Sequence, residues 1–116
     1  SAKSILANLE KDAGFDFSGT ILSSTGAATL VRILQAFYEE FSDIFQSWES
    51  GADWNQEEQR RIAHSIKGSA HSIGALTLAK FAAATELEIK NGESTNLAIL
   101  MEHLNVLLIR LSSVLP

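Results

Sequence analysis

Apolar residues recur every three or four positions through most of the chain, which is the pattern of amphipathic helices. The longest such stripe lies within residues 27–51 and consists of Leu30, Ile33, Leu34, Phe37, Phe41, Ile44, Phe45 and Trp48. Gly51 follows this stripe and is placed to end the helix. No segment alternates apolar and polar residues as a strand does, and the one proline is the last residue. The pattern therefore predicts an all-α protein.

Three more helices are expected after the first. The next begins at an N-cap, either Asp53 or Asn55, and runs to about Ile73. Another lies within residues 75–92, and one side of it carries Leu78, Phe81, Ala82, Thr85 and Ile89. The last begins after a cap, Ser94 or Thr95, and repeats Leu97, Leu100, Leu104, Leu107, Leu111 and Val114.

Four amphipathic helices joined by short turns bury their stripes most simply as an antiparallel, up-down-up-down four-helix bundle, here over about residues 25–115. Residues 1–20 are less periodic, and we expect them to form a linker and a short additional N-terminal helix that caps one end. The length of 116 residues fits a single domain. Because such a bundle buries its stripes internally, we expect a monomer.

Composition narrows the possible functions. The formal net charge of −5 argues against nucleic-acid binding. The chain has no uninterrupted apolar run of about 20 residues, so we expect no membrane insertion. It has no cysteine, which excludes disulfides and suits the cytoplasm. His64 and His71 are about 10 Å apart along a helix, whereas helical metal sites pair histidines four residues apart, so no metal site is predicted.

The charge is unevenly distributed along the chain. Residues 59–85 contain no acidic residue and carry a net charge of +4, while the remainder carries −9. At about 100° per residue, Ile62, Ile66, Ala70 and Ile73 lie opposite His64, which therefore faces solvent. The predicted exposed face gathers basic and small residues around His64, namely Arg60, Arg61, Lys67, Gly68 and His71.

Gly68 is unexpected in the middle of a helix, because glycine costs about 1 kcal/mol there relative to alanine. This cost indicates that another molecule approaches the backbone beside His64. Neutral imidazole is a nitrogen nucleophile, and a lysine one turn away can stabilise phosphoryl oxygens on the ring. The acid-free segment also predicts that no carboxylate lies beside His64, where it would repel a phosphoryl group.

The stretch AHSIKGSAHSIGA, residues 63–75, closely resembles the H-x-[LI]-K-G-[SA]-[SA]-x-x-[IL]-G-A signature of histidine-containing phosphotransfer (HPt) domains. The resemblance implies that His64 accepts a phosphoryl group, that Lys67 stabilises it, and that Gly68 leaves clearance for a docking receiver domain. By the same resemblance, Gly74 ends the helix and permits a tight helix–helix approach. His71 stands where many members have glycine or asparagine.

The remaining residues of the exposed face are candidates for contact with a partner. They are Arg60, Arg61, Ser65 and His71, together with Phe37, Phe41 or Tyr38 of the preceding helix if any of these is exposed. His103 is expected in peripheral packing, because it neighbours apolar Leu104 in the last helix.

The resemblance implies a phosphorelay carrier that takes a phosphoryl group from a receiver-domain aspartate and passes it reversibly to a response-regulator aspartate. Mg²⁺ would belong to the receiver, and this chain would bind no cofactor. The chain lacks a nucleotide-binding domain, so it would have no ATP-dependent kinase activity of its own. We expect the C-terminal module of a bacterial hybrid sensor kinase, tethered to the inner membrane through its parent, or else a free-standing carrier. The alternative is a helical docking adaptor in which His64 is inert.

Overall fold

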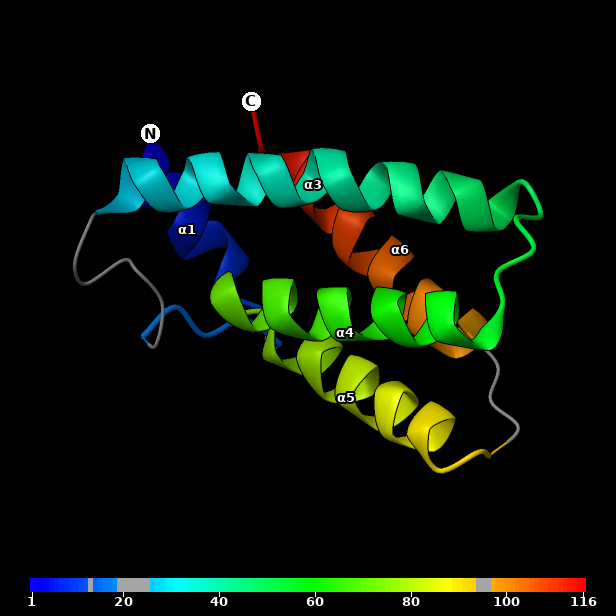
Figure 1. Cartoon of the computed structure of the whole chain (residues 1–116). Helices are drawn as coiled ribbons and strands as arrows, with labels where there is room; N and C mark the ends of the chain where they lie inside the picture. Colours follow the sequence, from blue (N-terminus) through cyan, green and yellow to red (C-terminus); the bar gives the residue numbers. More distant parts are fainter. Residues whose placement is uncertain (13, 19–25, 94–96) are drawn as a thin grey trace.

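The computed structural model describes residues 1–12, 14–18, 26–93 and 97–116. Within these residues it contains five helices, α1 (Ala2–Leu9), α3 (Ala27–Glu49), α4 (Gln56–Ser72), α5 (Leu76–Lys90) and α6 (Leu97–Val114), as Figure 1 shows. No described residue belongs to a named strand, and an isolated bridge pairs Phe15 with Ala75. The prediction of an all-α bundle with a short N-terminal helix is confirmed.

The start of α4 and the ends of α3 and α5 lie where capping and turn residues predicted them. Asn55 is the N-cap of α4, and its side chain accepts a hydrogen bond of 2.8 Å from the backbone N–H of Glu58. Gly51 after α3 and Gly92 after α5 have φ angles of +88° and +69°, a left-handed conformation that glycine adopts without strain. The caps predicted at Ser94 or Thr95 lie outside the described residues.

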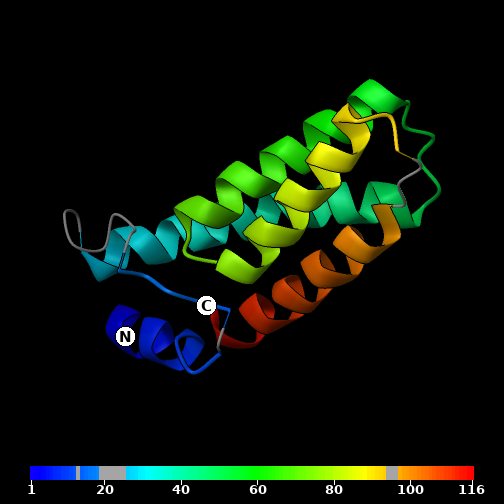
Figure 2. The ribbon, with the colours of Figure 1, turned by 90° about the horizontal axis from the view of Figure 1, so that it is seen from below.

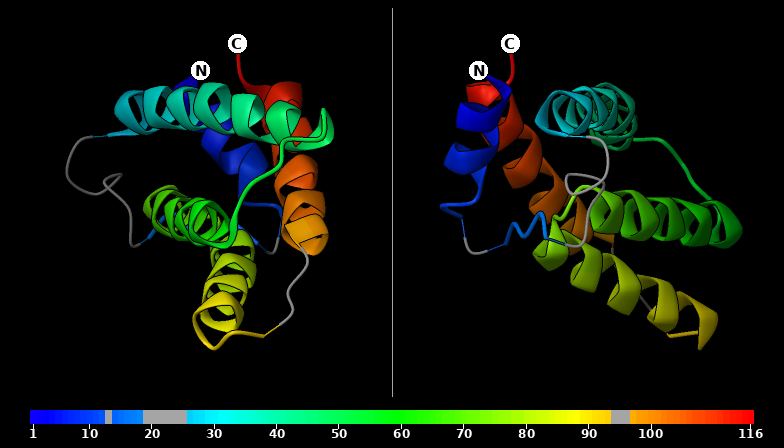
Figure 3. Two further views of the ribbon diagram at one scale, coloured as in Figure 1. Left: turned by 45° about the vertical axis from the view of Figure 1, so that its right-hand side comes forward. Right: turned by 90° about the vertical axis from the view of Figure 1, so that its left-hand side faces the viewer.

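Successive helices reverse direction from α3 to α6, which gives the expected up-down-up-down order (Figure 1). Figure 2 shows α4 and α5 lying along each other as a helical hairpin. Helix α5 also packs against α6, which in turn packs against α3 and α1. The two views of Figure 3 show the α4–α5 hairpin on one side of the molecule, and α3, α1 and the C-terminal end of α6 on the other. One face of α4 therefore lies open beside α5.

The apolar stripes form the core between the helices. The buried residues of α6 are Leu97, Leu100, Met101, Leu104, Leu107, Leu108 and Leu111. By length and composition, with a mean hydropathy of 1.5, α6 is also apolar enough to cross a membrane. Its buried face packs in the core of the bundle, and the helix also carries the charged residues Glu102 and Arg110 outside that face. The core thus accounts for the apolar character of this face of the helix.

Aromatic residues of α3 belong to the core and do not form a contact surface beside His64. Phe37 and Phe41 are buried, with ring centroids 4.5 Å apart. They were candidates for the contact surface only if exposed, and this condition is not met, because their stripe is the face that α3 turns toward α1 and α6. Tyr38 is half-buried near Ser112 and Leu115 at the C-terminal end of the chain.

The segment after α1 is fixed against the turn between α4 and α5. The backbone N–H of Asp16 donates to the carbonyl of Gly74, and that of Leu76 donates to the carbonyl of Gly14, each at 2.8 Å. Gly74 has a φ of +74°, and a Cβ atom there would collide with the carbonyl oxygen of Asp16. Gly74 ends α4 as expected, but the close approach is to this N-terminal segment and not to another helix.

Candidate functional site

Helix α4 presents the predicted site residues on the side away from the core. Ala63, Ile66 and Ala70 are buried on one side of the helix, while the His64 side chain on the other is 62% exposed. The same exposed side carries Ser65, Gly68 and His71. Apart from its chain neighbours and the backbone of its own helix, no atom lies within 4 Å of the position that a Cβ on residue 68 would take, so neither packing nor backbone conformation requires glycine there.

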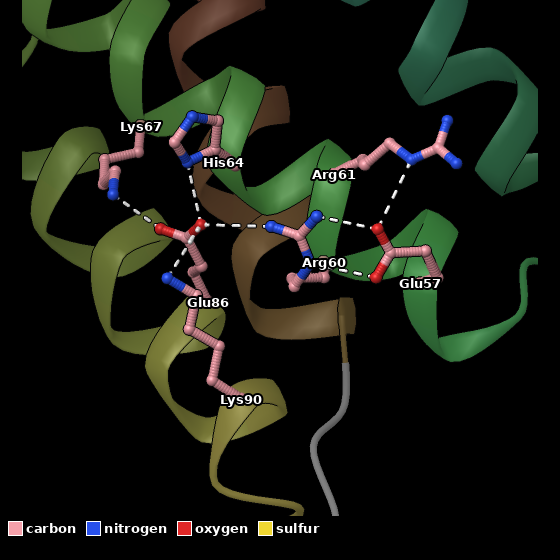
Figure 4. Close-up of polar contacts among 7 residues, drawn as sticks. All are labelled: Glu57, Arg60, Arg61, His64, Lys67, Glu86 and Lys90. Atoms are coloured by element: carbon pink, nitrogen blue, oxygen red, sulfur yellow. Dashed lines mark hydrogen bonds and ion pairs between the residues drawn. The ribbon is translucent and has the colours of Figure 1, made fainter.

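A carboxylate from α5 lies beside His64, contrary to the sequence-based expectation (Figure 4). The Glu86 side chain is 4% exposed, and its Oε2 lies 2.8 Å from Nδ1 of His64. Lys67 Nζ donates to Oε1 of the same carboxylate at 2.5 Å. Arg60 Nη1 and Lys90 Nζ lie 3.8 Å from Oε2. The expectation failed because these cations offset the negative charge that was thought to exclude a carboxylate.

The charge of Glu86 determines which ring nitrogen of neutral His64 carries the proton. The hydrogen bond from Lys67 is the largest cause that lowers the pKa of Glu86, and it outweighs burial, which acts in the opposite direction. Glu86 is therefore ionised near neutral pH, and an ionised carboxylate only accepts hydrogen bonds. Nδ1 of neutral His64 must then carry the proton. The other ring nitrogen, Nε2, keeps a free lone pair, and Figure 4 shows it on the side of the ring away from Glu86.

A second group of ion pairs adjoins the first on α4. Glu57 accepts two hydrogen bonds from Arg60, of 3.0 Å from Nε and 2.7 Å from Nη2, and lies 3.6 Å from Nε of Arg61. The bonding with Arg60 lowers the pKa of Glu57 to about 2. The seven residues of Figure 4 thus include four positively charged side chains and two carboxylates besides His64. With His64 neutral, the group carries a surplus of two positive charges.

Glu86 is the functional candidate that sequence reasoning missed. It is the first acidic residue after the acid-free segment 59–85, and it lies on the buried side of α5 with Leu78, Ala82 and Ile89. A carboxylate is seldom fully buried without a partner, so its position on an apolar stripe was the available signal. Identifying His64 as that partner required knowing how α4 and α5 pack.

The geometry defines a class of site. An exposed nucleophilic nitrogen, fixed through its other ring nitrogen and surrounded by surplus positive charge, suits a transferable anionic group such as phosphoryl. His103, by contrast, stacks on Phe81 with ring centroids 3.7 Å apart and so takes part in packing. Among the described residues, no cluster of three or more histidine, aspartate or glutamate side chains is arranged to hold a metal ion.

Comparison with protein families agrees with this class of site. The model of the Hpt domain family matches residues 32–114, and the chain belongs to this family. Membership implies histidine phosphotransfer in the phosphorelays of two-component systems, in which Hpt domains interact with receiver domains. Comparisons with curated proteins and with solved structures found no match to this chain.

Proposed function

We propose that His64 accepts a phosphoryl group on Nε2 from a receiver-domain aspartate and passes it to an aspartate of a response regulator. The observation that carries this proposal is the contact of 2.8 Å between Nδ1 of His64 and the buried carboxylate of Glu86. It fixes the ring while leaving Nε2 accessible on a side chain that is 62% exposed. A histidine without such a partner would sample both tautomers and several rotamers.

In the transfer step, the Nε2 lone pair attacks the phosphorus of the aspartyl phosphate. A P–N bond forms, the P–O bond breaks, and the aspartate leaves as a carboxylate. Because Nδ1 keeps its proton, the ring gains positive charge as the P–N bond forms. Glu86 stabilises this charge by accepting the Nδ1 hydrogen bond, as the aspartate of a catalytic triad stabilises an imidazolium. The reverse step returns the phosphoryl group to an aspartate, and Mg²⁺ is assigned to the receiver.

Lys67 interacts with both anionic groups in this scheme, the Glu86 carboxylate and the phosphoryl group. Its ammonium group has three donors, and one of them is used by Glu86 at 2.5 Å. The Lys67 side chain is 36% exposed, so the remaining donors can reach phosphoryl oxygens that arrive on the neighbouring ring. Lys67 would therefore hold Glu86 before transfer and share its charge with the phosphoryl group afterwards.

The docking surface is assigned to the open face of α4 and the adjoining side of α5. Gly68 supplies clearance, and Arg61, Ser65 and His71 line the same exposed face. On α5, Leu87 follows Glu86 directly and is 59% exposed, which adds an apolar contact. Surplus positive charge around His64 suits the acidic pocket of a receiver domain.

The proposal is tested by incubating the chain with a receiver domain that carries a labelled aspartyl phosphate. His64→Gln should abolish labelling, while His103→Gln, at a histidine of α6 outside the docking surface, should retain it. The labelled product should be acid-labile and base-stable, and ³¹P and ¹⁵N spectra should place the phosphoryl group on Nε2. A chain that binds the phosphorylated receiver but never becomes labelled would overturn the proposal and favour the docking adaptor with an inert His64.

A further inference from the structure

Arg60 connects two carboxylates of very different exposure. Its Nε and Nη2 atoms bind Glu57, which is 55% exposed, in a two-pronged arrangement. Its remaining terminal nitrogen, Nη1, lies 3.8 Å from Oε2 of Glu86. This Oε2 is also the atom that lies 2.8 Å from Nδ1 of His64. Figure 4 shows the resulting chain of contacts from Glu57 through Arg60 and Glu86 to the imidazole.

Glu57 restricts the position of this positive charge. A fork of two hydrogen bonds defines the orientation of a guanidinium far better than a single ion pair does. Glu57 also lies in the first turn of α4, where the helix dipole favours a carboxylate. The guanidinium of Arg60 is therefore held beside the carboxylate of Glu86 and does not take a position over the imidazole ring.

The charge around the imidazole is opposite in sign to that of a phosphoryl group. The seven residues of Figure 4 carry a surplus of two positive charges while His64 is neutral. A phosphoryl group carries a charge of about −1.5 to −2 near neutral pH. Because the ring gains one positive charge when Nδ1 keeps its proton, phosphorylation of His64 would lower the surplus of the cluster from two positive charges to between about one and 1.5. Each added or removed charge should change how strongly the phosphoryl group is held.

We propose that Glu57 and Arg60 form a charge-tuning pair that sets the equilibrium of the phosphoryl group between His64 and a receiver aspartate. Arg60 stabilises phosphorylated His64 by holding a fixed positive charge beside the Glu86–His64 contact. Glu57 limits this stabilisation by binding Arg60 and offsetting its charge, so that the phosphoryl group can leave again. Both are positioning residues, since neither contacts the phosphoryl group. The inference rests on the proposed function and deepens it.

The variants to compare are Glu57→Gln, Arg60→Gln, the double variant, and Glu58→Gln as a matched control. Glu58 is exposed in the same helical turn, and its replacement changes the net charge equally without touching Arg60. The measurement is the equilibrium constant for phosphoryl exchange with one phosphorylated receiver domain, at low and at high salt. Direct phosphorylation by phosphoramidate supplies a receiver-independent readout, in which the P–N bond of the reagent breaks, ammonia leaves and the phosphoryl group moves to Nε2.

Glu57→Gln should shift the equilibrium about fivefold toward phosphorylated His64, and Arg60→Gln should shift it about fivefold the other way. The double variant should return close to wild type, and Glu58→Gln should differ little from it. The shifts should shrink at high salt, which the loss of a merely structural contact would not do. Equal constants for Glu57→Gln and Glu58→Gln would overturn the tuning pair while leaving His64 as the acceptor. Absence of labelling in the wild type with either donor would overturn the proposed function itself.

Discussion

Replacing Gly68 by alanine should separate the stability of the bundle from its activity. Gly68 is exposed within α4, and an added Cβ would meet no atom within 4 Å. The variant should therefore gain the full difference in helix propensity, about 1 kcal/mol in the free energy of unfolding. For a domain of 116 residues, this gain corresponds to a rise of about 4 °C in the melting temperature.

The same methyl group should impair transfer if a receiver domain closes over this position. An added group in a well-packed contact costs about 1–3 kcal/mol, which lowers the rate constant about 5- to 150-fold. The longer side chain of Gly68→Gln should lower transfer further while still supporting the helix. Stability and transfer would then change in opposite directions in one protein.

The assay combines thermal unfolding with initial rates of phosphoryl transfer from a phosphorylated receiver domain. Ser47→Ala is the matched control, because Ser47 is exposed within α3 and its replacement should raise helix stability slightly without affecting transfer. Phosphoramidate, which is small, should label Gly68→Ala as fast as wild type. Unchanged transfer in Gly68→Gln would refute the argument that this glycine exists to admit a partner, as would a loss of stability in Gly68→Ala.

Two further predictions concern the carboxylate beside His64 and the glycine that ends α4. The pKa of Glu86 is lowered in the folded state from an ordinary value of 4.5, so its stabilisation is complete above about pH 4.5 and is lost as the pH falls through the lower folded value. The free energy of unfolding, measured with denaturant from about pH 6 to pH 3, should be lower for Glu86→Gln than for wild type by about 1–3 kcal/mol at pH 6. This difference should vanish as the pH falls. A difference that stays constant with pH would contradict the argument. Gly74→Ala should cost about 2–4 kcal/mol, because it combines a φ of +74° with a collision against Asp16. Gly92→Ala, at a φ of +69° with open space around it, should cost only about 1 kcal/mol, and equal losses in the two variants would contradict the packing argument.

The sequence was sufficient for features that depend on one helix at a time. Spacing and capping residues predicted the four long helices, and Asn55, one of two candidate caps, is the residue that caps α4. The exposure of His64 also followed from helical periodicity, because Ile66 and Ala70 had to face the core on the opposite side. These properties follow from the regular geometry of a helix and need no knowledge of its neighbours.

Features that depend on packing between helices could not be predicted in the same way. Glu86 was missed because it becomes a partner of His64 only when α5 lies along α4. The close approach at Gly74 was assigned to a helix, whereas the neighbour is an N-terminal segment with little periodicity of its own. Phe37 and Phe41 were candidates for the surface only if exposed, and they are buried, as their spacing along the stripe of α3 already indicated.

The contacts of Arg110 bear on the order in which parts of the chain fold. It binds Asp12 at 2.6 Å and the carbonyl of Asn8 at 2.8 Å across sequence separations of 98 and 102 residues. His64 and Glu86 are only 22 residues apart and lie in adjacent helices. Contacts between near neighbours in sequence form at a lower cost in chain entropy than contacts between distant segments. The α4–α5 hairpin should therefore form early and assemble the pair of His64 and Glu86, and the docking of α1 through Arg110 should complete folding.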